Sequence, residues 1–169
     1  KLVDISKVLY DQVHALCAPY QEGSFDWLQL WAPGRIWTLQ SDLCCMLSPR
    51  TFRDLVLEEL REEAKHVDYA FYHLDGPGAI KQIDALLGIE ALDGIQWVPG
   101  AGASQDPMDW LDLFRRVQTA GKKLLIYCPP ERIKPLLAGI SKRGVCLAVD
   151  CTDQETAEGV LLALDRIGI

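Results

Sequence analysis

His73 and Asp75 are the two side chains of this sequence that are best placed to do chemistry together. They lie two residues apart at the end of the β-rich run 69–74, and alternate residues of a strand project to the same side. An imidazole nitrogen and a carboxylate oxygen on one face can share a ligand or move a proton. The pattern is equally typical of a histidine that is merely hydrogen-bonded by a neighbouring carboxylate.

Cys151 is a third candidate, because it follows the last predicted strand and precedes a predicted helix. The positive end of that helix dipole favours a thiolate. His73, Asp75 and Cys151 together offer the N, O and S donors that zinc accepts in an open site with a position left for substrate. The alternative is that Cys151 packs as a small apolar side chain, as most free cysteines do.

Three further residues follow or end other predicted strands. Asp42 comes after the first strand, where it could act as a general base or bind a substrate amine, or could only cap a helix or turn. Gln96 and Trp97 lie toward the end of the strand 94–98, where they could form the wall of a pocket. For Trp97 a place in the core is the alternative.

Composition excludes several classes of function. With 17 basic and 24 acidic residues, the net charge of -7 offers no field to attract nucleic acid or anionic lipid. The apolar run 160–164 is far shorter than the roughly 20 residues of a membrane span. No glycine-rich phosphate-binding loop follows a strand. We therefore expect a small-molecule substrate, no nucleic acid and no membrane.

The six cysteines show no C-x-x-C pair and no repeated spacing, which favours reduced thiols over a disulfide framework or a zinc knuckle. No export signal is visible at the Lys1 end, which resembles a cut end. The sequence therefore predicts a cytoplasmic protein.

The elements that must position these residues alternate along the chain. Strands are predicted over 35–40, 69–74, 94–98, 123–128 and 145–149. Six helices are predicted: up to about residue 20, from Ser48-Pro49, over 80–87, from Asp106-Pro107, from Pro129-Pro130, and from a Thr152-x-x-Glu155 capping box. Because helix-sized crossovers join parallel strands, the class is α/β, and the candidate residues are expected at the carboxyl rim of one parallel sheet.

Four segments of the chain, in their order, resemble the carboxyl-terminal half of the uroporphyrinogen decarboxylase superfamily. They are residues 39–43, residues 47–52 with the motif Ser-Pro-x-x-Phe, residues 72–76, and residues 94–97 with the motif Gly-x-x-Trp. That superfamily also contains cobalamin-dependent methyltransferases, and the similarity runs from about residue 2 to about residue 164.

The resemblance implies a (β/α)8 TIM barrel about twice as long as this chain. Residues 1–169 would then be its carboxyl-terminal half, with the amino-terminal half absent. A half barrel exposes strand edges and an apolar interior, so we expect it to need the missing half or a second copy of itself.

The resemblance also implies a reaction. Zinc-dependent methyltransferases of the superfamily carry His-x-Cys and a distant Cys where this chain has His73, Asp75 and Cys151. Asp75 departs from that pattern and makes the donor set harder. We expect a metal-assisted methyltransferase that exchanges a methyl group between a small heteroatom substrate and a corrinoid, bound in the barrel mouth or carried by a partner protein. His73 and Asp42 would be catalytic, and Asp42 and Gln96 would orient the substrate.

Three alternatives remain open. In a metal-free porphyrinogen decarboxylase-like enzyme, His73 and Asp75 would bind a substrate carboxylate or pyrrole nitrogens. In a non-catalytic corrinoid- or ligand-binding module, a ligand would be retained without turnover. A stand-alone half barrel that dimerises as a scaffold is the third alternative, because fold alone does not determine function.

Overall fold

A five-stranded parallel sheet forms the centre of the protein in this computed structural model, which describes residues 1–166. Its strands follow one another in chain order: β3 (Ile36–Leu39), β4 (Tyr69–Asp75), β5 (Gly94–Val98), β6 (Lys123–Tyr127) and β7 (Val145–Ala148). Each neighbouring pair is parallel. The predicted α/β class and the five predicted strands are confirmed.

The described residues also form seven α-helices and five short 3-10 helices. The α-helices are α1 (Leu2–Cys17), α2 (Pro49–Leu55), α3 (Leu57–Ala64), α4 (Ile83–Leu87), α5 (Leu111–Thr119), α6 (Ile133–Gly139) and α7 (Gln154–Asp165). The 3-10 helices are η1 (Ala18–Tyr20), η2 (Asp42–Cys45), η3 (Pro77–Gln82), η4 (Pro107–Trp110) and η5 (Pro130–Arg132). One α-helix more than predicted is present, because the second helical segment is interrupted at Val56, where φ is -117°.

Helix caps decide where several of these helices begin. The predicted caps Ser48 and Asp106 are confirmed, since their side chains accept hydrogen bonds from the backbone N–H of Thr51 and Met108. The predicted capping box at Thr152 is wrong: the cap is Asp153, whose carboxylate accepts from the Thr156 N–H at 2.7 Å. A carboxylate is an equally good N-cap and adds a favourable charge at the helix dipole.

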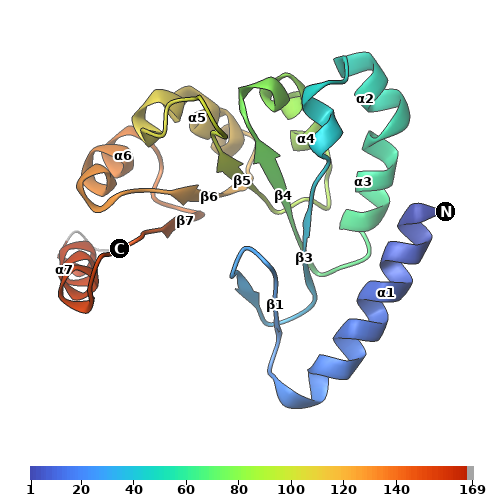
Figure 1. Ribbon diagram of the computed structural model, residues 1–169, viewed down its shortest axis with the longest axis horizontal. Helices are drawn as coiled ribbons and strands as arrows, with labels where there is room; N and C mark the ends of the chain where they lie inside the picture. Colours follow the sequence, from blue (N-terminus) through green and yellow to red (C-terminus); the bar gives the residue numbers. More distant parts are fainter. Residues whose placement is uncertain (167–169) are drawn as a thin grey trace.

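The sheet is curved, with α2 to α6 packed along its convex face (Figure 1). Consecutive strands that are all parallel, with their crossover helices on one face, are typical of successive units of a β/α barrel. Within residues 1–166 the sheet is open, running from β3 at one edge to β7 at the other. The structure thus shows a partial β/α fold.

Alternate residues of the strands divide between the two faces. In β4, the side chains of Ala70, Tyr72 and Leu74 are buried in the main core under the helices. Phe71 lies on the concave face, in a small second cluster with Leu28 and Leu125. We use "concave face" below for this side of the sheet.

A short antiparallel hairpin that the sequence analysis did not predict covers part of the concave face. It consists of β1 (Ser24–Phe25) and β2 (Trp31–Ala32). Asp26 holds its turn, because its Oδ1 accepts from the N–H groups of Leu28 at 3.0 Å and Leu30 at 3.1 Å. Strands of two residues carry no readable periodicity, which explains why the pattern missed them.

Two observations bear on the predictions made from composition. All six cysteines are free thiols, as the lack of a paired spacing predicted. None of the helices within residues 1–166 combines the length and apolarity that crossing a membrane requires.

Gln82 connects the helix after β4 to the loop after β3 through side-chain hydrogen bonds. The side chain is 1% exposed, and its Nε2 donates to the carbonyls of Cys44 and Leu47, both at 2.9 Å. This pair of hydrogen bonds fixes η2, the element on which Asp42 lies.

Replacing Gln82 with leucine should therefore lower the free energy of unfolding by about 1–3 kcal/mol, because one buried and one partly buried carbonyl lose their donor. Urea denaturation measures the change. The exposed Gln12→Leu serves as the control and should change stability by less than about 0.5 kcal/mol. Equal stability of the two variants would contradict this account of the loop.

Candidate functional site

A histidine and a buried glutamine form the centre of the candidate site on the concave face. His73 Nδ1 donates a hydrogen bond to Gln96 Oε1. The two residues are register partners on the neighbouring strands β4 and β5. Gln96 is 1% exposed and His73 is half-buried. The bond assigns the neutral ring the tautomer with its proton on Nδ1, which leaves the Nε2 lone pair available.

The alternation of the strands brings these two side chains to the same face. Tyr72 and Leu74 on either side of His73 are buried in the helix-covered core, and Ile95 and Trp97 flank Gln96 in the same way. Since successive side chains of a strand point to opposite faces, His73 and Gln96 must both point to the concave face.

The hairpin adds an aromatic wall that the sequence analysis missed. The Trp27 ring meets the His73 ring edge-on, with the ring centroids 5.2 Å apart and the planes at 71°. Next to Trp27, the Asp26 carboxylate accepts a hydrogen bond from the Thr38 hydroxyl on β3. The signal that could have found the hairpin is the pair of turn sequences that bracket it, Gly23-Ser24 and Pro33-Gly34.

Asp75 ends β4 and is exposed, two residues beyond His73 on the same side of the strand. Glycines let the backbone pass close to it. A Cβ at Gly100, where φ is +74°, would lie 3.3 Å from Asp75 Oδ1. At Gly76, where φ is +75°, the N–H donates to the Val98 carbonyl at 2.8 Å. Gly76 forms the turn that leads from β4 into η3.

Asp42 begins η2 at the carboxyl end of β3, where it is exposed. Its carboxylate forms neither a hydrogen bond nor an ion pair within residues 1–166, although its backbone carbonyl accepts a hydrogen bond from Cys45 Sγ at 3.2 Å. Asp42 thus lies at the carboxyl end of β3 with an exposed side chain, and its role in binding or catalysis stays a prediction.

Trp97 lies away from the concave face. It is 2% exposed, and its ring packs against that of Trp110 in the core, with centroids 4.8 Å apart. The structure thus places it where the alternative interpretation expected it, in the core.

Cys151 also lies apart from His73 and Asp75. It lines a groove against α7 together with Leu147 and Val149, whose side chains pack against the main core. That groove is on the helix side of the sheet, and β7 is three strand spacings from β4, roughly 14 Å along the sheet. The alternating apolar residues at 145, 147 and 149 were the signal that could have placed Cys151 on this side.

The sequence predicted a zinc site at this rim. Whether a metal fits there depends on how the predicted donor side chains are arranged. Two of the three expected donors, His73 and Asp75, share the concave side, and Cys151 does not. No group of three His, Cys, Asp or Glu residues in the described part of the chain is arranged to hold a metal. The expected three-donor set therefore does not fit this arrangement, and zinc stays a prediction.

Cys128, at the end of β6, is a buried thiol. Burial raises its pKa to about 11, and the nearby carboxylates of Glu131 and Asp106 contribute to the shift. Near neutral pH the side chain is therefore a thiol rather than a nucleophilic thiolate.

Comparison with protein-family models, with curated proteins and with solved structures gives no match for the chain. The class defined by the fold and the site is a parallel α/β sheet with a histidine–glutamine pair on its concave face. Membership of the uroporphyrinogen decarboxylase superfamily stays a prediction from the sequence motifs.

The hydrogen bond to Gln96 should hold neutral His73 in one tautomer. In ¹⁵N spectra of the imidazole at a pH where it is neutral, we expect a protonated Nδ1 and an unprotonated Nε2. Gln96→Leu should replace these signals with averaged ones, because no acceptor remains beside Nδ1. The exposed Gln21→Leu is the control and should leave them unchanged. A Gln96→Leu variant with the wild-type tautomer would refute the proposed role of the amide.

Proposed function

We propose that this chain forms one half of a uroporphyrinogen decarboxylase-like barrel and takes part in corrinoid-dependent methyl transfer to or from the heteroatom of a small molecule. The observation that carries the proposal is the orientation of His73. A buried amide holds its Nδ1, and its Nε2 is free to exchange a proton on the concave face.

Proton transfer is the step that these residues can perform. A thiol, alcohol or amine becomes a methyl acceptor when its proton leaves, and His73 Nε2 can take that proton as the heteroatom–carbon bond forms. In the opposite direction, the imidazolium returns the proton as the methyl group leaves. The corrinoid, carried by a partner protein, supplies the cobalt that donates or accepts the methyl group.

The neighbouring residues support this exchange in different ways. The Asp75 carboxylate, on the same side of β4, stabilises the imidazolium that forms. Trp27 covers one edge of the His73 ring and limits the access of water to it. Asp42, whose carboxylate has no partner within residues 1–166, would bind and orient a polar substrate group.

Metal assistance is not part of this mechanism, since Cys151 does not join His73 and Asp75. No step above depends on zinc. A cytoplasmic location also stays a prediction from the sequence.

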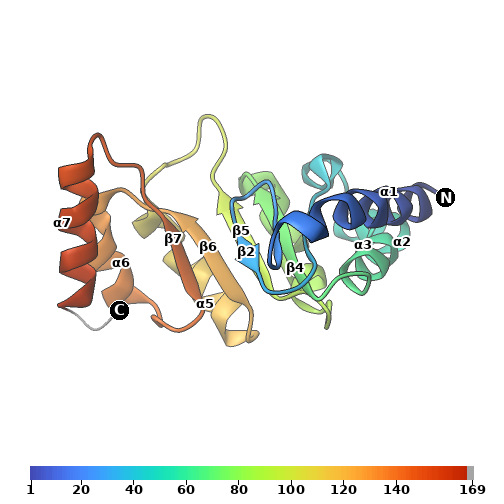
Figure 2. The same cartoon turned by 90° about the horizontal axis from the view of Figure 1, so that it is seen from below.

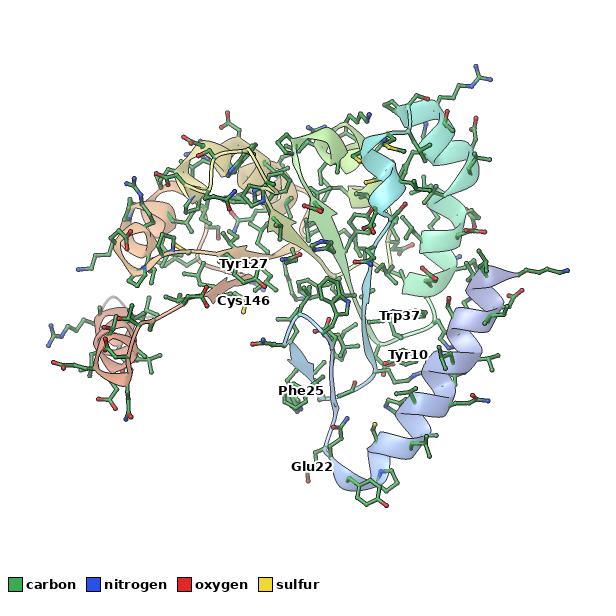
Figure 3. The ribbon with its side chains drawn as sticks, viewed as in Figure 1. Tyr10, Glu22, Phe25, Trp37, Tyr127 and Cys146 are labelled. Atoms are coloured by element: carbon green, nitrogen blue, oxygen red, sulfur yellow. The ribbon has the colours of Figure 1, made fainter. Side chains whose placement is uncertain are left out.

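We propose that the open sheet binds a partner, and the exposed apolar residues of α1 support this part of the proposal. Leu2, Ile5, Leu9, Val13 and Leu16 follow one another at helical spacing along α1, and each is more than half exposed. The opposite side of the helix packs on β3, where Tyr10 stacks on Trp37 with ring centroids 5.1 Å apart (Figure 3). An apolar stripe of this length favours coverage by the other half of a barrel or by a second copy.

The 169-residue chain purified alone should therefore self-associate, with a native mass above 18.9 kDa. Replacing Leu9 and Val13 with glutamate should shift it toward the monomer, because two charges would be buried in the contact. The matched control is Leu55→Glu, on the exposed side of α2. A wild-type chain that is monomeric at micromolar concentration would contradict a role for this stripe in association.

The reaction can be tested with the complete protein and methylcob(III)alamin, using a panel of small thiols, alcohols and amines as acceptors. We expect acceptor-dependent loss of methylcobalamin absorbance, and a rate that His73→Ala lowers by about 10²- to 10⁴-fold through loss of the proton-transfer group. His14→Ala, a histidine on α1, should keep the wild-type rate. Full activity of His73→Ala, or no consumption by the wild-type protein with any acceptor, would overturn the proposal.

A second candidate is a metal-free porphyrinogen decarboxylase-like enzyme. The position of Cys151 favours it, because the ligand set implied for the zinc methyltransferases is not assembled on one face. In that enzyme, His73 and Asp75 would contact a carboxylate or pyrrole nitrogens of the substrate. Release of CO₂ from uroporphyrinogen without methyl transfer would support this candidate, whereas retained cobalamin without any turnover would indicate a non-catalytic binding module.

A further inference from the structure

A cavity of about 270 Å³ lies at the carboxyl ends of β6 and β7. These are the next two strands of the sheet after β5, the strand that carries Gln96. Its lining combines an aromatic ring, a carboxylate and an amide with three less polar residues: Tyr127, Asp150, Gln105, Cys128, Pro129 and Ala148. None of these residues takes part in the proton transfer described above. Their chemistry indicates a separate binding function.

The strand register brings the cavity walls together. Tyr127 and Ala148 are partners in the β6–β7 pairing, and the Cys128 N–H donates to the Ala148 carbonyl at 2.9 Å. Tyr127 is 47% exposed and projects to the same side of the sheet as Cys146, away from the helices (Figure 3). The Tyr127 side chain is thus accessible from the cavity that it lines.

The polar groups of the cavity are acceptors that lack a cationic partner. Asp150 forms no hydrogen bond or ion pair within the described part of the chain. Gln105 uses its Nε2 to donate to the carbonyls of Gly100 and Ala103, at 2.9 and 3.1 Å, which leaves its Oε1 to accept. Gln105 belongs to the loop that extends beyond the carboxyl end of β5 (Figure 2).

The surroundings of the cavity are also acidic. The nearby Arg132 is neutralised by Asp106, with 2.6 Å between Nη2 and Oδ2. Besides burial, the carboxylates of Glu131 and Asp106 raise the pKa of the Cys128 thiol in the cavity wall. A chain with a net charge of -7 reinforces this negative potential.

We propose that this cavity binds a small organic cation, a quaternary ammonium or a protonated amine, between the Tyr127 ring and the Asp150 carboxylate. The negative face of an aromatic ring attracts such a cation, and the carboxylate adds a direct ion pair. An anion would be repelled by Asp150, and a neutral molecule would contact the same walls without the attraction of its charge to the ring and the carboxylate. The site is independent of the methyl-transfer proposal, because binding needs no turnover.

Choline and its neutral isostere 3,3-dimethylbutan-1-ol test the proposal, since they differ in charge at nearly constant shape. In ¹⁵N-labelled protein, choline should shift the backbone amides of Cys128 and Ala148 saturably, and the neutral isostere should not. Asp150→Asn and Tyr127→Leu should each weaken choline binding by about fivefold or more. Tyr127→Phe keeps the aromatic face and should retain binding.

Asp165→Asn removes one negative charge elsewhere and controls for non-specific attraction to an acidic protein. It should leave the choline titration unchanged. Equal shifts with the neutral isostere would overturn the proposal, as would a titration that Asp150→Asn leaves unaltered. These measurements do not depend on methyl transfer. A failure of the methyltransferase assay would therefore not affect the test of this cation site.

Discussion

Burial of one face of the sheet under the helices is the constraint on which the rest of the structure depends. Each strand of the sheet must present its most apolar side chains to the same layer of helices, as Tyr72, Leu74 and Ile95 do. The alternate residues of the strand must then point to the opposite, concave face. His73 and Gln96 face the concave side because their neighbours along the chain are needed in the core.

The hydrogen bond between His73 and Gln96 forms because both side chains point to the concave face. A fully buried amide must find a partner, and the imidazole of the adjacent strand supplies one. The same bond sets which nitrogen of His73 can exchange a proton. The packing of the two strands thereby sets the tautomer of His73, the candidate general base.

The concave face is only partly covered. The β1–β2 hairpin brings Leu28 onto Phe71 and Trp27 onto His73, but Tyr127 and Cys146 remain exposed nearer the β7 edge. Aromatic and thiol surface is therefore open on this side of the sheet. It also leaves room for a second ligand site at the ends of β6 and β7.

Local sequence determined the α/β class, the five parallel strands and the caps at Ser48 and Asp106, because strand propensity, helix periodicity and capping act over a few neighbouring residues. It also placed His73 and Asp75 on one side of one strand, since the period of a strand is two. Only the tertiary structure decided which side each strand turns to the helices. Odd-numbered residues face the concave side in β4 but the core in β7, so His73 reaches Gln96 and Trp27 while Cys151 is turned away. That choice depends on packing between strands and helices far apart in the chain, which no local pattern encodes.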